Sequence, residues 1–431
     1  MAPGLRRLAV ALTTAALLLT VAVSAVLVLQ SSGQTSAVGS DTPAATPGDG
    51  DWTASWGAAL TGPDTEGRSV TGFDDVTLRQ VVHLSLGGDV LRLRLSNVHG
   101  ERPLSVGAVT LAPHDGRPGT PEVDADRLVR ATFAGRAGTL VPVGGTLASD
   151  PIALEVPDDS DLVVNVHVAR ASGPTTWQAS ALATSYVADG DATLAGGEAF
   201  TELDTSRYYL AGVDVVDEAS DGTVVFVGDS LTAGADSTLD ADRRFPDLVA
   251  DRLFAAAGRG GSAATGRCGV VNAGIGGNRL LSGSGISGDA LVDRFARDVL
   301  DVPGVRTVVV LAGINDIGAA GDDLDPAALM AGHRALVDAA HEAGVRVVGA
   351  TLLPYGGAGY ATVGGERTRR AVNRWLMTSG THDAVVDLDA AVRDPDRPYR
   401  LWPSYDSGDH LHPDDAGYGA MADAVDLTSI C

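Results

Sequence analysis

The chain of 431 residues is long enough for two domains, each with its own hydrophobic core. Hydrophobic residues make up 45% of it, a composition typical of a folded globular protein and not of a disordered one. The 55 acidic residues outnumber the 31 basic residues and give a net charge of −24. Because such a surface repels phosphate groups, we expect no nucleic-acid partner.

The first 30 residues predict export. Arg6 and Arg7 precede an apolar stretch without charges over residues 8–29, and small residues inside this stretch resemble a signal cleavage site. The stretch also has the length of a membrane span, so residues 1–30 are predicted to be either a signal peptide or a membrane anchor. With the arginine pair inside, the rest of the chain lies outside the cytoplasm. We therefore expect a secreted or cell-surface protein.

Residues 31–50 are rich in Ser, Thr, Pro and Gly, which predicts a flexible linker. The pattern then changes to short alternating runs over residues 51–217. In "DVLRLRLSN", for example, Leu91, Leu93 and Leu95 would lie on one face of a strand. Similar runs are "TLRQVVHLSL", "LSVGAVTLA", "DPIALEV", "DLVVNVHVA" and "ATSYVADG". Many short strands predict an all-β, jelly-roll-like sandwich domain here.

Apolar runs alternate with helical periodicity over residues 218–431. The predicted strands cover 224–227, 270–272, 307–311, 345–350 and 385–387. The predicted helices cover 245–257, 290–299, 326–343, 366–379 and 414–426. Repeated strand and helix predict a three-layer α/β domain with a parallel sheet.

Polar residues of catalytic type occur at the predicted strand ends and near the C-terminus. The segments are "GDSL" at 228–231, "NAGIGGNR" at 272–279, "GIND" at 313–316, and the pair Asp409 and His412. Each alone is ordinary turn or helix-cap chemistry. Because functional residues gather at the carboxyl ends of parallel strands, their order and placement together predict a catalytic site.

These four segments resemble the sequence blocks of the SGNH hydrolase family, the GDSL-type esterases and lipases. The resemblance covers the chain from about Gly222 onward, and the first domain resembles the β-rich segment of secreted bacterial members. It implies a flavodoxin-like α/β fold. The Gly-x-Ser-x-Gly elbow of the larger α/β-hydrolase fold is absent, because Thr232 occupies the last glycine position.

The resemblance implies a role for each matching residue. Ser230 would be the nucleophile, His412 its general base, and Asp409 the group that orients the histidine ring. The oxyanion hole would consist of the backbone N–H groups of Ser230 and Gly277 and the side-chain amide of Asn315. No cofactor and no metal are implied. We expect a monomeric serine esterase that acts on carboxylic esters, with acetyl esters of carbohydrates and short-chain lipid esters as candidate substrates.

Three other interpretations stay open at this point. The chain would also fit a non-catalytic carbohydrate-binding protein of the cell surface on a hydrolase scaffold, and a peptidase would use the same three residue types. The pair His410-x-His412 resembles two ligands of a metal ion, although no further His or Cys cluster accompanies it.

The remaining histidines and the cysteines receive structural interpretations. His333 and His341 are expected to be solvated on the helix 326–343. Cys268 and Cys431 are the only cysteines, and an oxidising compartment would allow them to form a disulfide. Sequence alone leaves their pairing open, because it does not show that they meet.

Overall fold

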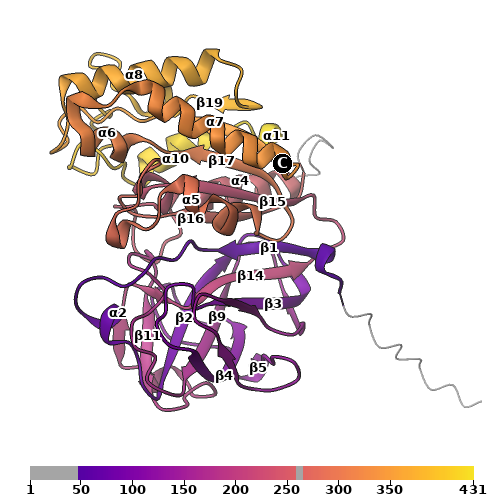
Figure 1. Ribbon diagram of the computed structural model, residues 1–431. Helices are drawn as coiled ribbons and strands as arrows, with labels where there is room; N and C mark the ends of the chain where they lie inside the picture. Colours follow the sequence, from indigo (N-terminus) through magenta and orange to yellow (C-terminus); the bar gives the residue numbers. More distant parts are fainter. Residues whose placement is uncertain (1–46, 259–265) are drawn as a thin grey trace, which may run out of the picture. The chain divides into compact units, whose positions relative to one another are not determined.

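The computed structural model describes residues 47–258 and 266–431 (Figure 1). The predicted signal or anchor segment, and the predicted linker up to residue 46, lie outside the described residues. Within the two described stretches, no helix combines the length and the apolar character that crossing a membrane requires.

The first part of the chain is β-rich and contains two larger antiparallel sheets. One has the strand order β1 (Trp52–Gly57), β14 (Leu210–Val216), β3 (Gly88–Ser96) and β7 (Thr146–Ala148), with β8 (Ile152–Val156) also paired to β3. The other has the order β12 (Glu202–Asp204), β11 (Ser185–Asp189), β2 (Val76–Leu84), β9 (Ser160–Val168), β4 (Leu104–Pro113) and β5 (Val129–Arg130), with β6 (Thr139–Val141) paired to β4. A small ribbon joins β10 (Trp177–Gln178) to β13 (Arg207–Tyr208), and α2 (Arg68–Thr71) precedes β2.

The alternating sequence runs explain how the two sheets pack against each other. Leu91, Leu93 and Leu95 of β3 are fully buried, as their period of two predicts, and they share one hydrophobic core with residues such as Val109 of β4 and Val166 of β9. The two sheets therefore bury one another's inner faces. The region is β-rich as predicted, whereas its jelly-roll connectivity stays a prediction.

The second part of the chain is built on a five-stranded parallel sheet. Its strands are β15 (Gly222–Gly228), β16 (Cys268–Gly274), β17 (Val305–Leu311), β18 (Arg346–Ala350) and β19 (Ala384–Val386). The spatial order is β16-β15-β17-β18-β19, so the first strand lies between the second and the third, as in flavodoxin-like sheets. All residues of β15 and β16 are buried, which explains their continuous apolar sequences.

Helices connect these strands. They are α3 (Ser230–Ala233), α4 (Phe245–Gly258), α5 (Leu291–Phe295) with the π-helical turn η5 (Ala296–Leu300), α6 (Ile314–Ala320), α7 (Pro326–Glu342), α8 (Val363–Thr378), α9 (Leu388–Val392), α10 (Asp415–Asp423) and α11 (Leu427–Ile430). The predicted helix 414–426 ends at Asp423, and α11 follows it after a break. A disulfide links Cys268 at the start of β16 to Cys431, with their Cα atoms 6.0 Å apart.

Strand β1 lies against the edge strand of the parallel sheet. Ala58 forms an isolated parallel bridge with Asn272, and Ala54 donates its backbone N–H to the carbonyl of Pro303 at 3.2 Å. At Gly269 a Cβ atom would come within 2.1 Å of the Ala54 carbonyl oxygen, so only glycine permits this approach. The β-rich region thus covers an otherwise open sheet edge.

The change in strand pairing falls near the predicted domain boundary. Antiparallel pairing ends with β14 and parallel pairing begins with β15. The boundary at 217/218 itself stays a prediction.

One expectation about the histidines is wrong. His333 is fully buried in α7, where its Nε2 lies 3.2 Å from the Ala312 carbonyl oxygen. Burial, together with the neighbouring His382, lowers the pKa of His333 to about 4. The ring therefore belongs to the core, and only His341, whose side chain is 46% exposed, is solvated as expected.

Candidate active site

Ser230 lies where strand β15 ends and helix α3 begins. Asp229 is the N-cap of α3, and its side chain accepts a hydrogen bond from the backbone N–H of Leu231 at 3.0 Å. This turn places Ser230 at the first position of the helix, 9% exposed. Burial raises the pKa of Asp229 to about 7, and the nearby Asp316 acts in the same direction. Asp229 therefore braces the turn beside Ser230.

A single loop before α10 carries both His412 and Asp409. The Nε2 atom of His412 lies 2.8 Å from the Ser230 hydroxyl oxygen, and its Nδ1 atom lies 2.6 Å from the Asp409 carboxylate. The other carboxylate oxygen of Asp409 accepts the backbone N–H groups of Leu411 and His412, each at 2.8 Å. The loop thus fixes the acid and the ring on one backbone segment.

The surroundings of Asp409 indicate which atoms carry protons in the contacts among Ser230, His412 and Asp409. Burial acts to raise the pKa of Asp409, but the hydrogen bonds from the backbone of His412 and Leu411 and from the His412 ring outweigh it and hold the pKa below its ordinary value. An ionised Asp409 only accepts hydrogen bonds, so Nδ1 of His412 carries a proton and donates it. Nε2 is then free to accept the hydroxyl hydrogen of Ser230.

Gly277 and Asn315 lie on two neighbouring segments that are joined to each other. Asn315, on α6, donates its side-chain amide to the carbonyl of Asn278 at 3.1 Å, which leaves its second amide hydrogen available. Gly277 has a φ of +69°, and a Cβ there would come within 2.6 Å of the Ser287 hydroxyl oxygen. In the described part of the chain, neither Ser230 nor Gly277 donates its backbone N–H to a protein acceptor. These donors are free to meet a ligand.

A buried arginine that the sequence analysis did not single out holds the strand ends together. Arg294 of α5 is fully buried and donates to the carbonyl oxygens of Gly228 and Ala273, each at 2.9 Å. It also donates to the side chain of Asn278 at 3.1 Å. One guanidinium therefore fixes the ends of β15 and β16 and the loop after Gly277. The only signal in the sequence was an arginine within the predicted helix 290–299, and helical periodicity does not tell whether such a residue is buried.

The two histidines of the His410-x-His412 pair contact different carboxylates. His410 places its Nδ1 atom 2.6 Å from Asp406, whereas His412 contacts Asp409 and Ser230. Asp236, Asp409 and His412 could offer ligand atoms to one ion, and Asp236 also accepts the Ser407 hydroxyl at 2.9 Å. Because hydrogen bonds within the protein already engage these groups, the arrangement favours proton transfer over metal ligation. That no metal is needed stays a prediction.

A pocket of about 160 Å³ opens beside Ser230. Its lining from the α/β part is Ser230, Ala233, Ala235, Gly274, Ile275, Gly276 and Ile286. Its lining from the β-rich part is Ala59, Thr61, Gln178, Ala179, Ser180 and Leu182. No sequence pattern predicts the contribution of the β-rich part, because contacts between distant segments leave no local pattern.

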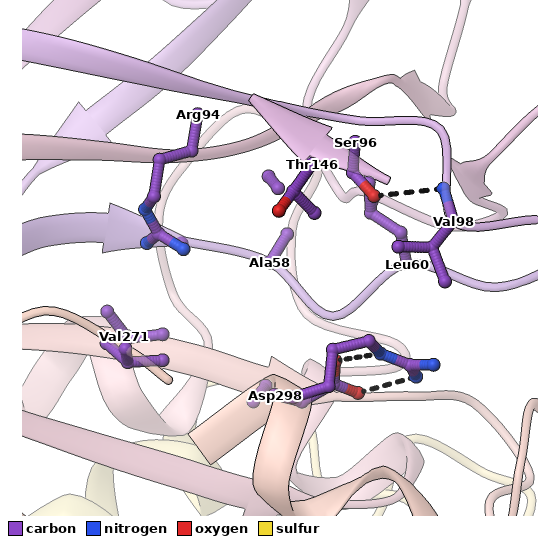
Figure 2. Close-up of a pocket in the computed structure, with 13 residues that line it drawn as sticks. Ala58, Leu60, Arg94, Ser96, Val98, Thr146, Val271 and Asp298 are labelled. Carbon is purple, nitrogen blue, oxygen red and sulfur yellow. Dashed lines mark hydrogen bonds and ion pairs between the residues drawn. The ribbon is translucent and has the colours of Figure 1, made fainter. Parts of the chain in front are cut away.

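A smaller pocket of about 60 Å³ lies elsewhere between β1, β3 and the parallel sheet. Figure 2 shows Arg94 and Ser96 of β3 on one side of it, and Val271 of β16 and Asp298 of η5 on the other. Ser230, His412 and Asp409 do not line it. We therefore place the candidate active site at the pocket beside Ser230.

Part of the chain matches a known protein family. Residues 226–420 match the model of the GDSL-like Lipase/Acylhydrolase family. A search of curated proteins finds none that matches the chain. Among solved structures, similar chains include a protein of the G-D-S-L lipolytic family from Desulfitobacterium hafniense, with 21% identity, 47% of this chain and 96% of that chain covered, and a TM-score of 0.36. An acetylxylan esterase from Geobacillus stearothermophilus has 22% identity, 48% and 93% coverage, and a TM-score of 0.37.

These structural likenesses are weak, and the assignment rests on the family match. The match spans the parallel sheet from β15 onward and includes Ser230, Gly277, Asn315, Asp409 and His412. Residues 226–420 therefore form a carboxylic ester hydrolase domain of the GDSL-like lipase/acylhydrolase family.

Proposed function

We propose that this protein hydrolyses carboxylic esters with Ser230 as nucleophile, His412 as general base and Asp409 as the group that orients the ring. The observation that carries the proposal is the unbroken line of contacts, 2.8 Å from the Ser230 hydroxyl to His412 and 2.6 Å from His412 to Asp409. In the first step the Ser230 oxygen attacks the ester carbonyl carbon, and its proton passes to Nε2 of His412. Asp409 favours the imidazolium that results.

The acyl-enzyme then forms and is hydrolysed. The imidazolium of His412 gives its proton to the leaving alcohol oxygen, so the bond between the carbonyl carbon and that oxygen breaks and Ser230 holds the acyl group. Water attacks this ester while His412 takes the proton of the water, and the acid leaves when Ser230 recovers its hydrogen. Each proton moves through one ring nitrogen, which the Asp409 contact keeps in place.

We assign stabilisation of the tetrahedral oxyanion to the N–H groups of Ser230 and Gly277 and the amide of Asn315. Two features support this assignment. The two backbone N–H groups have no acceptor among the described residues, and the Asn315 amide has a spare hydrogen. Donors already in place avoid reorganisation when the charge develops.

The experiment that tests the proposed function is Ser230→Ala. We expect loss of p-nitrophenyl acetate hydrolysis and of covalent labelling by a fluorophosphonate, with an unchanged circular dichroism spectrum. Ser429→Ala, in α11, is the matched control and should keep both activities. Full turnover by Ser230→Ala would refute the assignment. Absence of turnover by the unaltered protein would instead favour the non-catalytic binding function.

For the substrate we propose short-chain esters, with acetylated carbohydrates placed ahead of lipid esters because of the exported, two-region layout that the sequence predicts. The small pocket beside Ser230 supports the short acyl group. A comparison of acetylated xylan and mannan with short-chain glycerol esters separates the two classes by their kcat/KM.

We also propose that the protein acts outside the cytoplasm. Support comes from the apolar N-terminal stretch behind Arg6 and Arg7, and from the disulfide between Cys268 and Cys431, a bond that persists in oxidising compartments. Fractionation of producing cells, with the chain followed by an antibody, tests this location and shows whether a membrane anchor is retained.

A further inference from the structure

We infer that the β-rich region forms one wall of the acyl-binding pocket and that Leu182 limits the length of the acyl chain. The inference rests on the proposed function of Ser230 and extends it to specificity. Six of the residues around the pocket beside Ser230 come from the β-rich region, and they belong to the segment after β1 and the segment from Gln178 to Leu182. The pocket is therefore incomplete without the β-rich region.

The position of the catalytic histidine indicates which half of the ester enters this pocket. The leaving alcohol oxygen must lie beside Nε2 of His412, because it takes its proton from that atom. Of the three proposed catalytic residues, only Ser230 is among the described residues that line the pocket. His412 does not line the pocket. The alcohol therefore leaves on the His412 side, and the pocket on the other side receives the acyl group.

The pocket suits a short hydrocarbon chain. Its volume is about 160 Å³, and an apolar cavity of roughly 150 Å³ holds a molecule the size of benzene. Alanine, leucine and isoleucine side chains supply much of the lining; the largest aliphatic groups are Leu182 from the β-rich region and Ile275 and Ile286 from the α/β domain. Acyl groups up to about six carbons would fit, and longer chains would meet Leu182 or Ile286.

Hydrogen bonds from both parts of the chain fix the Leu182 segment. On the α/β side, Asp240 donates its backbone N–H to the Leu182 carbonyl at 3.1 Å, and its carboxylate accepts the hydroxyl of Thr184 at 2.6 Å. On the β-rich side, Ser206 donates its hydroxyl to the Ala179 carbonyl at 2.9 Å. A wall held at both ends stays in place when an acyl chain presses against it.

The backbone at Leu182 also has an uncommon conformation. Its φ is +51°, in the left-handed region that branched side chains rarely adopt. Such a conformation persists only where the surrounding structure imposes it, and the bonds to Asp240 do so here. These bonds fix the backbone position from which Leu182 lines the pocket.

The test measures kcat/KM for a series of p-nitrophenyl esters from acetate to octanoate. Leu182→Ala should raise the octanoate-to-acetate ratio about tenfold, because removal of a wall group admits the longer chain. Leu182→Phe should lower the butyrate-to-acetate ratio by filling the pocket. Ile286→Ala shortens a side chain on the α/β side of the pocket. Because Ile286 is 43% exposed, this variant should fold normally, and it should also raise the octanoate-to-acetate ratio.

The control is Leu140→Ala, which removes an exposed leucine of the β-rich region outside this pocket. It should leave the ratio unchanged. The inference is overturned if folded Leu182 and Ile286 variants that fluorophosphonate still labels at Ser230 keep the octanoate-to-acetate ratio of the unaltered protein. That outcome differs from failure of the proposed function, in which the unaltered protein itself shows neither turnover nor labelling.

Discussion

The carboxylates around Ser230 have different environments, and these environments separate their roles. Asp409 accepts three hydrogen bonds from Leu411 and His412, which keep it ionised and suited to hold an imidazolium. Asp229 is buried, and its Oδ2 atom has no hydrogen-bond partner in the described residues. Burial raises its pKa to about 7, so it is poorly suited to hold a positive ring at neutral pH. Adjacency in sequence to Ser230 therefore does not decide which carboxylate is suited to orient the His412 ring.

Single residues were predictable where their chemistry is tied to a motif. The sequence blocks predict Ser230, Asp409 and His412 as nucleophile, orienting acid and base, because these residue types form a recognisable set. The structure brings the three side chains into contact, and their roles stay predictions. Leu182 carries no such chemistry, and its place at the pocket depends on pairing between distant segments. The expectation that His333 is solvated was wrong. An imidazole is polar and suggests an exposed helix face, but in the core a carbonyl oxygen at 3.2 Å satisfies the Nε2 atom of His333.

Asn315 is one of the three proposed oxyanion donors. Asn315→Ala should lower kcat by about 10²–10³-fold, since one oxyanion donor contributes roughly 2.7–4 kcal/mol to the transition state. KM should change little, because the amide serves the developing charge and not the bound ester. Steady-state kinetics with p-nitrophenyl acetate measures both constants. A kcat equal to that of the unaltered protein would remove Asn315 from the oxyanion hole.

At the level of elements, the loop after β16 and helix α6 act as one unit. Asp316 of α6 accepts the backbone N–H groups of Leu280 at 2.7 Å and Leu281 at 3.0 Å. The loop that carries Gly277 is thus tied to the helix that carries Asn315. Two of the three proposed oxyanion donors therefore depend on a carboxylate that itself needs no contact with substrate.

The sequence predicted the elements of the parallel sheet well, for a physical reason. Strands buried on both faces are continuous apolar runs, so β15, β17 and β18 stand out. Short elements such as α6 and α9 were not predicted as helices, because fewer than two or three turns give no period to detect. The insertion of β14 between β1 and β3 depends on long-range pairing that no local pattern encodes.

Asp316→Ala tests whether the tie between loop and helix positions the oxyanion donors. We expect kcat to fall by up to about a hundredfold with little change in KM, because a small displacement of a donor is costly in the transition state. The effect should not add to that of Asn315→Ala, since both remove one stabilising arrangement.

Asp325→Ala is the matched control for this element. Asp325 also accepts a backbone N–H, from Ala327 at 2.9 Å, but it caps α7. Its loss should cost about 1 kcal/mol of stability and leave kcat unchanged. Full additivity between the Asp316 and Asn315 variants, or an equal loss of kcat in the Asp325 variant, would contradict a positioning role for Asp316.

Over the whole molecule, charged groups join the β-rich region to the α/β domain. Arg267, just before β16, contacts Asp158 at 2.5 Å and Asp217 at 2.6 Å. His83 of β2 lies 2.8 Å from Asp161, and a carboxylate of the α/β domain, Asp242, lies 3.9 Å from the same ring nitrogen. Because the pocket beside Ser230 is lined from both regions, these contacts stabilise the arrangement on which the pocket depends.

The surroundings of His83 are strongly acidic. Burial acts against a charge on the ring, but the hydrogen bond with Asp161 and the charges of Asp242, Asp161 and Asp247 outweigh it and raise the pKa of His83 to about 9. Asp159 contacts the second ring nitrogen at 3.0 Å, so both nitrogens can donate to carboxylates. The carboxylates that face the ring are Asp159, Asp161, Asp242, Asp247 and Asp251.

A pKa raised on folding gives a pH dependence with a definite sign. The protonated ring stabilises the folded state fully below pH 6.5, its ordinary value, and this contribution is lost as the pH rises through about 9. The shift corresponds to at most about 3 kcal/mol. We compare the unaltered protein with His83→Gln by urea unfolding across this range. The stability advantage of the unaltered protein should be largest at the acidic end and should shrink steadily between pH 6.5 and about 9.

His341→Gln, which removes a more exposed partner of Asp383, is the control and should show a small difference at every pH. An advantage that stays constant or grows with pH would show that His83 does not hold the two regions together through its charge.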